Sequence, residues 1–321
     1  MRFSDAQCVL CCCVTDRFAW RSSGVSRVNY RHSFHAGNHG DVLKHIVLAR
    51  TLQLMASKDK PLAVLDAHAG VGRYDLTGVQ ATKTGEWLGG IAKLDEDFAS
   101  DVEAVMASYR DVLAAINPDG HGKYYPGSPE IISRLIRADD RLIANELHPV
   151  DALELTTNYS ALKNVYVKQL DYLQAIKSEL PFRERRGLVL IDPPFEVLDE
   201  TLRATQALQF GYRRMATATF MIWYPVTTDE FAAQFLSTIK SLNIPNMMWC
   251  ELRIKAAFAQ GGLSGSGLII VNPPWTLEND LRILLPALAE RLGVGDWGRG
   301  QVEWLTPPKS SQVDCFTSDR F

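Results

Sequence analysis

The strongest constraint on the fold is a short apolar run, residues 188–191, that ends abruptly in Asp192-Pro193-Pro194-Phe195. Consecutive apolar residues that include Val and Ile are typical of a strand buried on both faces, as in a parallel sheet covered by helices. Open α/β sheets bind their ligands at the carboxyl ends of such strands. Because proline fixes φ and donates no N–H, the two prolines predict a rigid loop with free carbonyl groups there. The sequence therefore predicts an α/β fold whose ligand-binding edge carries Asp192.

This loop resembles the Asp-Pro-Pro-aromatic motif of methyltransferases that modify exocyclic amino groups, chiefly N6 of adenine. Such an amine is a poor nucleophile because its lone pair is delocalised into the ring, and two hydrogen-bond acceptors favour a pyramidal nitrogen. The Asp192 carboxylate and the Pro193 carbonyl can accept those bonds, and stacking of Phe195 on the base would contribute about 1–3 kcal/mol. The resemblance implies a catalytic loop made of Asp192, Pro193, Pro194 and Phe195. The alternative is an ordinary turn after a strand, because Asp-Pro and Pro-Pro are common turn signals.

An earlier apolar run, residues 62–65, ends in Asp66 and is followed by Gly70 and Gly72. Small residues between a strand and a helix let a ligand approach the backbone. The third glycine of the dinucleotide fingerprint is missing. One acid and two glycines therefore suit S-adenosylmethionine, which has no pyrophosphate to bind.

Two further acids follow expected strands. Glu146 comes after residues 141–144, and it is the candidate for the ribose hydroxyls of the cofactor. Asp171 comes after residues 165–169, at the position that usually faces the cofactor adenine, with Tyr172 beside it.

A competing candidate for the catalytic loop is Asn272-Pro273-Pro274-Trp275, which also follows an apolar run. It resembles a variant used by several amino-group methyltransferases. The order of the strands decides between the two loops. The first four expected strands supply the Gly-rich loop, Glu146, Asp171 and Asp192 in turn, whereas Asn272 comes three strands later, on an antiparallel strand. A structural role is expected for Asn272.

Residues 29–45 hold four of the seven histidines. Asn38 is a candidate N-cap for a helix that contains Asp41 and ends near residue 57. A zinc site built from His35 and His39 is conceivable, although no carboxylate or thiol lies at a familiar zinc spacing. The other interpretations are solvated surface histidines, or an active-site edge where Tyr30 stacks on a base and Arg31 contacts phosphate.

Composition limits the class of protein. Of 321 residues, 46% are hydrophobic and 22% charged, as in a soluble globular chain with one large α/β domain and an insertion, or with two domains. The net charge of −3 means that a nucleic-acid site must be a local patch. No apolar span is long enough for a transmembrane helix. The six cysteines do not form a disulfide framework, so a reducing cytoplasm is expected.

The expected domain organisation has three parts. Residues 1–27 differ in composition from the rest and are interpreted as a disordered or over-called leader, with a Cys-rich metal site or a targeting signal as alternatives. The methyltransferase domain is expected to run from 28 to 307. Residues 78–122 separate Asp66 from Glu146 and have a helical pattern, so they are expected to form a helical subdomain over the site or an enlarged crossover. No role is assigned to the tail, residues 308–321.

Taken together, several motifs resemble the bacterial 23S rRNA (adenine-2030-N6) methyltransferase family over residues 28–307. The motifs are Tyr30-Arg31-His32-Ser33-Phe34-His35-Ala36-Gly37-Asn38-His39, Asp66-Ala67-His68-Ala69-Gly70-Val71-Gly72-Arg73-Tyr74, Tyr124-Tyr125-Pro126-Gly127-Ser128-Pro129, Asn145-Glu146-Leu147-His148-Pro149, Asp192-Pro193-Pro194-Phe195 and Trp223-Tyr224-Pro225. Two residues depart from the family pattern. Tyr172 stands where the family often has Gly, and Phe195 where it commonly has Tyr, which removes any contact through a phenolic hydroxyl.

The resemblance implies a Rossmann-like S-adenosylmethionine-dependent methyltransferase fold with a seven-stranded mixed sheet and a small inserted helical subdomain. It implies direct in-line methyl transfer to N6 of a flipped-out adenine in 23S rRNA, without a metal. The implied cofactor residues are His45, Asp66, His68, Gly70, Gly72, Ser128, Glu146, Asp171, Tyr172 and Asp192. The implied RNA contacts are Tyr30, Arg31, His32 and Phe195.

Alternatives from other classes remain open at this stage. A DNA adenine-N6 methyltransferase would share the loops, a protein glutamine N5 methyltransferase would suit the Asn272 motif better, and a non-catalytic RNA-binding module would not bind S-adenosylmethionine. The expected partner is unassembled or early-assembly 23S rRNA, with no membrane, and the protein is expected to be a monomer. Two arginine clusters are candidate RNA contacts or solvated side chains: Arg183, Arg185 and Arg186, and Arg213 with Arg214.

Overall fold

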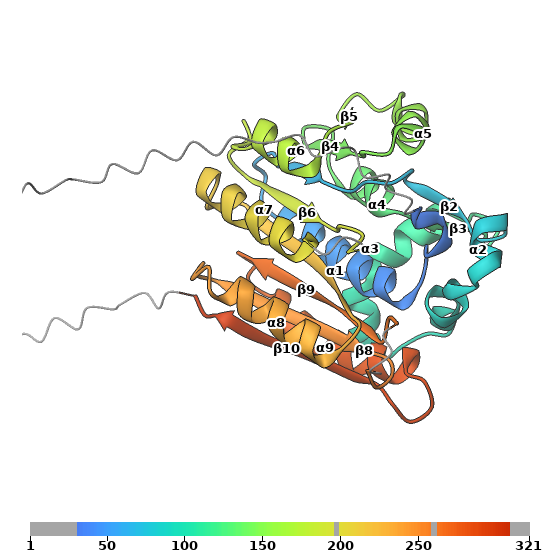
Figure 1. Ribbon diagram of the computed structural model, residues 1–321. Coiled ribbons are helices and arrows are strands. Elements are labelled where there is room, and N and C mark those ends of the chain that lie inside the picture. Colours follow the sequence, from blue (N-terminus) through green and yellow to red (C-terminus); the bar gives the residue numbers. More distant parts are fainter. Residues whose placement is uncertain (1–30, 196–198, 258–261, 309–321) are drawn as a thin grey trace, which may run out of the picture.

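The computed structural model describes residues 31–195, 199–257 and 262–308. The expected leader, Tyr30 and residues 309–321 of the expected tail lie outside these ranges. The fold is an α/β sandwich with helices on both faces of one large sheet (Figure 1).

The large sheet has eight strands in the order β10-β8-β9-β7-β6-β1-β4-β5. The five strands from β5 to β7 are parallel, and β9, β8 and β10 are joined to them in antiparallel pairs. All seven expected strands are present, and β10 adds an eighth at the edge. The strand bounds are β1 (Ala63–Asp66), β4 (Arg141–Asn145), β5 (Val165–Lys168), β6 (Gly187–Ile191), β7 (Thr219–Val226), β8 (Met247–Arg253), β9 (Gly265–Val271) and β10 (Arg299–Thr306).

The central strands are buried on both faces, as their apolar sequences predict. Every residue of β1 and β6 is buried. Along β1, Val64 packs into the core on one side of the sheet and Leu65 into the core on the other side. This alternation requires a helical layer on each face.

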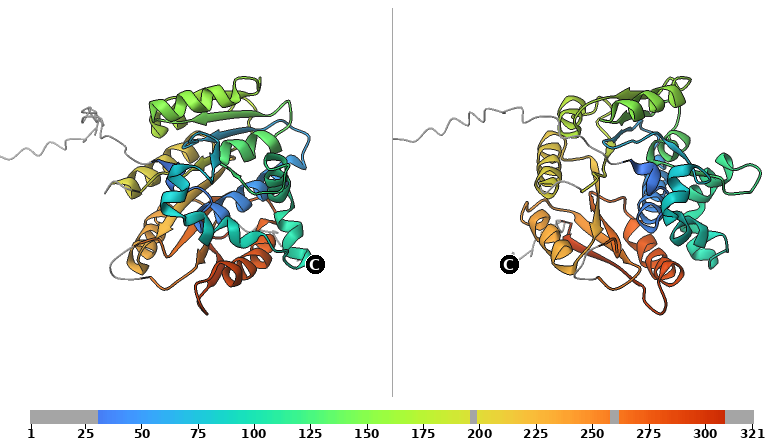
Figure 2. Two further views of the ribbon diagram at one scale, coloured as in Figure 1. Left: turned by 90° about the vertical axis from the view of Figure 1, so that its right-hand side faces the viewer. Right: turned by 45° about the vertical axis from the view of Figure 1, so that its right-hand side comes forward.

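The two helical layers are seen in the right-hand view of Figure 2, with α7 and α8 on one side of the sheet and α1 and α9 on the other. The first layer comprises α6 (Tyr172–Glu179), α7 (Glu200–Arg214) and α8 (Asp229–Lys240). The second comprises α1 (His39–Ala56), α3 (Ser100–Ile116), α4 (Ser128–Leu135) and α9 (Leu277–Leu292). The remaining elements are α2 (Val79–Thr84), α5 (Pro149–Tyr159), the 3-10 helices η1 (His32–Phe34), η2 (Glu86–Gly89) and η3 (Ile91–Leu94), and a separate ribbon of β2 (Arg73–Asp75) with β3 (Tyr124–Pro126).

Helix α1 is buried nearly all round because it packs on the sheet and is also contacted by the helices α3, α4 and α9. Asn38 is its N-cap, as predicted, and its side chain accepts a hydrogen bond of 3.0 Å from the Asp41 backbone N–H. The position of α1 carries several charged and polar side chains into the interior, beside the carboxyl ends of the central strands. These side chains form part of the candidate functional site.

The segment that was expected to form a helical insertion, residues 78–122, contains the helices α2, η2, η3 and α3. Helix α3 packs on α1, α4 and α9, so it forms an outer layer on this face of the sheet. Whether the segment acts as a separate subdomain over the site stays a prediction. No helix in the described part of the chain is long and apolar enough to cross a membrane.

Candidate functional site

The predicted acids lie at one edge of the sheet. Asp66 is the last residue of β1, and it is in register with Ala144 of β4 and Leu190 of β6. Glu146 and Asp192 directly follow the ends of β4 and β6. Because parallel strands end at the same edge, residues far apart in the chain meet here.

The Gly-rich loop, residues 67–72, is held to the end of β4 by Glu146. The carboxylate of Glu146 accepts hydrogen bonds from the backbone N–H of Gly70 at 2.9 Å and of His148 at 2.7 Å. Both glycines of the loop have positive φ, and a Cβ at Gly70 would lie 2.2 Å from the hydroxyl of Tyr74. Only glycine fits at these two positions without strain. Because neither position has a side chain, a ligand can approach the backbone of the loop there.

Asp66 is fully buried, and burial raises its pKa to about 7. The hydroxyl of Ser128, the first residue of α4, lies beside this carboxylate and offsets part of that effect on the pKa. Oδ1 accepts a hydrogen bond of 3.3 Å from the His68 backbone, whereas Oδ2 is buried and has no hydrogen-bond partner among the described residues. An unsatisfied buried acceptor beside a glycine loop fits a ligand that brings its own donor.

Asp171 is the N-cap of α6 and accepts a hydrogen bond of 2.9 Å from the Leu173 backbone N–H. The next side chain, Tyr172, is buried, and its ring lies 4.5 Å from that of His68. Its hydroxyl donates to Glu200 at 2.6 Å. The bulky residue that replaces the family's glycine thus packs against a predicted cofactor residue and turns its hydroxyl away to α7.

The predicted catalytic loop is held to the Gly-rich loop by His68. The backbone N–H of Asp192 donates to Nδ1 of His68 at 3.2 Å. His68 is buried, and its pKa is lowered to about 3 by that burial and by the charges of Arg203 and Lys44. The imidazole is therefore neutral, with its proton on Nε2, and it can accept at Nδ1.

Phe195 has a positive φ of 48°, which is uncommon for an aromatic residue. Its ring makes edge contacts with three aromatic rings of β7 and α8, at centroid distances of 6.0 Å to Trp223, 6.1 Å to Phe231 and 5.8 Å to Phe235. The stacking of Phe195 on a base stays a prediction.

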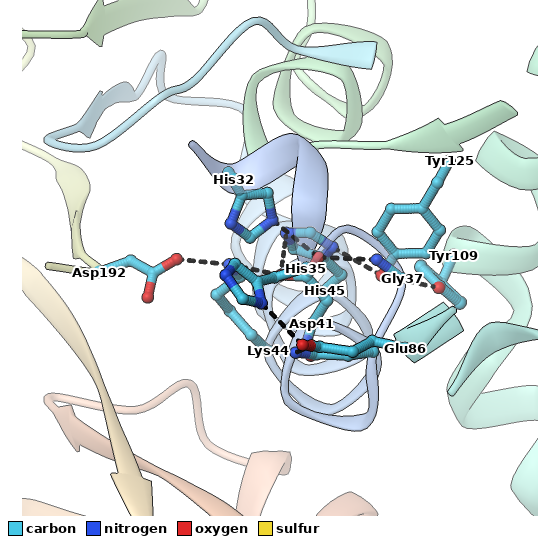
Figure 3. A network of polar contacts seen from close by, with 11 residues as sticks. His32, His35, Gly37, Asp41, Lys44, His45, Glu86, Tyr109, Tyr125 and Asp192 are labelled. Carbon is cyan, nitrogen blue, oxygen red and sulfur yellow. Dashed lines mark hydrogen bonds and ion pairs between the residues drawn. The ribbon is translucent and has the colours of Figure 1, made fainter. Parts of the chain in front are cut away.

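A residue that the sequence analysis missed, Lys44, forms an ion pair with Asp192 (Figure 3). Its Nζ also lies 2.8 Å from Oδ1 of Asp41, one helical turn earlier in α1. Burial disfavours the charged amine, but Asp192 and Asp41 outweigh burial and raise the pKa of Lys44. The sequence contained one indication of this role, because Lys44 follows Asp41 by one helical turn and lies among the apolar residues of the expected helix.

Two histidines of the opening stretch, His32 and His45, lie beside Asp41, whereas His35 is partly exposed and pairs with Glu86 at 2.9 Å. Nε2 of His32 lies 2.8 Å from Oδ2 of Asp41, which also accepts the Gly37 backbone N–H at 3.0 Å. Nδ1 of His45 bonds to the hydroxyl of Tyr125 at 2.9 Å, deep in the core. In residues 31–195, 199–257 and 262–308, no three His, Cys, Asp or Glu side chains are grouped as a metal site.

The structure places the two arginine clusters away from this edge. Arg186 precedes β6, at the opposite end of the strand from Asp192, and donates to the backbone carbonyls of Met55, Lys58 and Lys60. Arg214 donates to the carbonyl of Leu180 at 2.9 Å. These two arginines hold backbone segments together, and whether either cluster also contacts RNA stays a prediction. Arg31 forms an ion pair of 3.3 Å with Asp151 of α5.

Asn272 also lies at the opposite end of the sheet, because β9 is antiparallel to β7. Its side chain donates to the carbonyls of Ala216 at 2.9 Å and Ala218 at 2.8 Å. The competing loop is thus far from Asp66 along the strands, and the amide of Asn272 has a structural role.

Comparison with known proteins shows the family of the chain. A family model described as ribosomal RNA large subunit methyltransferase D, RlmJ, matches residues 59–306. The chain is 42% identical over 284 residues to the ribosomal RNA large subunit methyltransferase J of Haemophilus influenzae, which covers 87% of this chain and 99% of the relative. It is 38% identical over 280 residues to the protein of the same name in Escherichia coli K12, with the same coverage of each chain.

A crystal structure of a Legionella pneumophila protein superimposes with a TM-score of 0.77 at 33% identity and covers 84% of this chain and 98% of that one. The sheet is the Rossmann-like sheet of S-adenosylmethionine-dependent methyltransferases, with a strand added at one edge. The extent of these matches and the arrangement of the acids lead to one conclusion: the chain belongs to the RlmJ family of ribosomal RNA large subunit methyltransferases.

Proposed function

We propose that the protein methylates N6 of an adenine in 23S rRNA, at the position equivalent to the family's adenine 2030. The observation that carries the proposal is the Asp-Pro-Pro-Phe loop at the carboxyl end of β6, where Lys44 holds one oxygen of Asp192. Oδ1 of Asp192 makes no hydrogen bond with the described part of the chain, so it remains available as an acceptor.

Two acceptors at this edge suit an exocyclic amine. Oδ1 of Asp192 and the carbonyl of Pro193 can each accept one N6 hydrogen, which makes the nitrogen lone pair available. The Lys44 ammonium group fixes the carboxylate in one orientation. Asp192 need not be a strong base, because the nitrogen becomes acidic once it is alkylated. Alignment of two bound reactants can contribute about 7–11 kcal/mol to catalysis.

S-adenosylmethionine, when bound, supplies an activated methyl group on a sulfonium. The residues that would hold it line the carboxyl ends of β1, β4 and β5. Asp66 and Glu146 are acceptors beside the Gly-rich loop, and Asp171 and Tyr172 lie where the adenine is expected. Ser128, His68, Gly70 and Gly72 surround the same edge, whereas His45 lies deeper, against Tyr125.

The RNA must present an unstacked adenine, because a base inside a helix cannot reach Asp192. His32 bonds to Asp41, which in turn bonds to Lys44, so the segment before α1 enters beside the catalytic acid. This arrangement supports contacts of Arg31 and His32 with the RNA near the target base, and the contact of Tyr30 rests on the family resemblance alone. Phe195, at the end of the loop, would contact the base itself. Protein-free or early-assembly 23S rRNA is the proposed substrate.

The proposal is tested with purified protein, labelled S-adenosylmethionine and three substrates: protein-free 23S rRNA, adenine-containing DNA and a glutamine-containing protein. We expect label only in the RNA, as N6-methyladenine. Asp192→Asn, which changes one oxygen to an amide nitrogen, should lower the rate by about 10²–10³-fold. Transfer to DNA would favour the DNA methyltransferase alternative. Loss of activity in Asn272→Ala but not in Asp192→Asn would favour a glutamine methyltransferase.

A further inference from the structure

We infer that Arg203 of α7 is a positioning residue for the cofactor adenine, which it serves by holding Asp171 and Tyr172 in place. The inference rests on the proposed position of the adenine beside Asp171. Arg203 lies outside the motifs of the family resemblance, and it comes from the helix that follows the catalytic loop.

Arg203 contacts three neighbours at once. Its Nη2 donates to Oδ2 of Asp171 at 2.5 Å, and its Nε lies 3.8 Å from Oε1 of Glu200. Its Cζ lies 5.0 Å from the centre of the Tyr172 ring, in cation–π geometry. The side chains of Arg203 and Asp171 are about one quarter and one third exposed, so this group lies at the border of the site rather than in the core.

These contacts fix the plane of the Asp171 carboxylate. Oδ1 accepts the Leu173 backbone N–H, and Oδ2 accepts the guanidinium. Each carboxylate oxygen has two acceptor positions, so both oxygens keep one for a further donor, such as the 6-amino group of an adenine. A planar guanidinium holds such a geometry better than a flexible ammonium group.

Arg203 also lies close to two neighbouring acids, Asp171 and Glu200. Glu200 is buried, its pKa is raised by that burial, and the charge of Asp171 raises it further. The guanidinium contacts both carboxylates, and its positive charge offsets their mutual repulsion.

The same group touches the catalytic loop. The Tyr172 ring contacts both Arg203 and His68, and His68 accepts the backbone N–H of Asp192. The side chain that holds the adenine-binding acid is thus joined through these contacts to the loop that holds the acceptor base. This arrangement gives a reason for a Tyr at position 172, because a glycine would remove the ring that both side chains contact.

The experiment measures binding by calorimetry, without RNA. The ligands are S-adenosylhomocysteine and its analogue whose base is purine, which lacks only the 6-amino group. The proteins are the full chain and its Arg203→Ala, Arg203→Lys and Asp171→Asn variants. Arg282→Ala serves as a matched control, because Arg282 pairs with Glu278 on the exposed side of α9. Thermal unfolding of each variant is measured in parallel.

Arg203→Ala should weaken S-adenosylhomocysteine about tenfold, because it disorders a hydrogen bond to a charged group, but should weaken the purine analogue only about twofold. Arg203→Lys should lie between the two proteins, and Arg282→Ala should match the wild type. Equal losses for both ligands in Arg203→Ala, or no loss, would overturn the inference. If Asp171→Asn binds both ligands as tightly as the wild type does, the adenine does not lie at Asp171. That result would contradict the proposed adenine site itself, and with it the role of Arg203.

Discussion

Lys44 and Asp192 are 148 positions apart in the chain, yet their side chains form an ion pair inside the protein. A buried charge is stable there only because opposite charges surround it: Lys44 lies between Asp41 and Asp192. At the scale of single residues, the site is therefore a set of charges that depend on one another. Changing one of them should disturb the geometry of the others and also destabilise the fold, because it leaves a buried charge without its partner.

Lys44→Met keeps the length of the side chain and removes its charge. We expect the methylation rate to fall about 10²-fold, because Asp192 loses the group that fixes its orientation. The affinity for S-adenosylhomocysteine should change only a few-fold, because Lys44 is not among the proposed cofactor residues. Single-turnover rates and calorimetry test this, with the exposed Lys240→Met as a control. A Lys44→Met enzyme as fast as wild type would show that the ion pair has no part in catalysis.

Asp66 gives a prediction on pH and stability. Its pKa is raised to about 7 in the folded protein, against about 3.9 in the unfolded chain. The folded state binds more protons in this window, so the free energy of unfolding falls as the pH rises from about 4 to about 7. Asp66→Asn removes this effect. We expect the stability of the variant relative to wild type to increase between pH 5 and pH 8.

The measurement for Asp66→Asn is urea unfolding at both pH values. Equal differences in the free energy of unfolding at pH 5 and pH 8 would show that the Asp66 carboxyl ionises normally in the fold. Asn is nearly the same shape as Asp, so the comparison isolates the charge.

At the scale of elements, the strands that position the site could be predicted because each is a short run of mainly apolar residues, fully buried in β1 and β6 and partly exposed in β5. Their order also predicted that Asp66, Glu146 and Asp192 lie at one edge. Strand β10 was not predicted, because its sequence contains no apolar run. Every second residue in its first half is polar and exposed, namely Arg299, Gln301 and Glu303. It is stabilised by pairing with β8 and by packing on α9.

The contacts of Lys44 and Arg203 could not be predicted for a different reason. Both side chains belong to helices, and which residues they reach depends on how those helices pack on the sheet. Hydrophobic periodicity shows which face of a helix is buried, but not which strand end lies beside a polar side chain. The strand ends were therefore predictable, and the partners supplied by α1 and α7 were not.

The Gly-rich loop provides a test at this scale. Gly70→Ala would place a Cβ 2.2 Å from the Tyr74 hydroxyl at a positive φ. We expect a loss of about 1–3 kcal/mol in the free energy of unfolding, together with weaker binding of S-adenosylhomocysteine. Gly89→Ala is the matched control, because no atom lies within 4 Å of a Cβ built there. Equal behaviour of the two variants would contradict the role given to the loop.

At the scale of the whole molecule, both faces of the sheet are covered, and one polar edge carries the predicted chemistry. The parallel half of the sheet carries the proposed cofactor residues, and its border with the antiparallel half lies at β7, next to the proposed catalytic loop that follows β6. The aromatic rings around Phe195 come from β7 and α8. The site is thus placed where the two halves of the sheet meet.

The domain boundaries can be tested on the full chain. We predict that deletion of residues 1–27 leaves the methylation rate and the unfolding temperature unchanged, because the family resemblance starts at residue 28. A truncated protein that is unfolded or inactive would show that the first 27 residues belong to the functional domain.

The most direct test of the central claim is to map N6-methyladenine along the rRNA of cells with and without the gene. We predict one modified adenine in 23S rRNA, equivalent to the family's adenine 2030, that loses its methyl group in cells without the gene. Expression of the wild-type protein should restore this modification, whereas expression of the Asp192→Asn variant should not. Identical modification of 23S rRNA in both kinds of cell would contradict the proposed function.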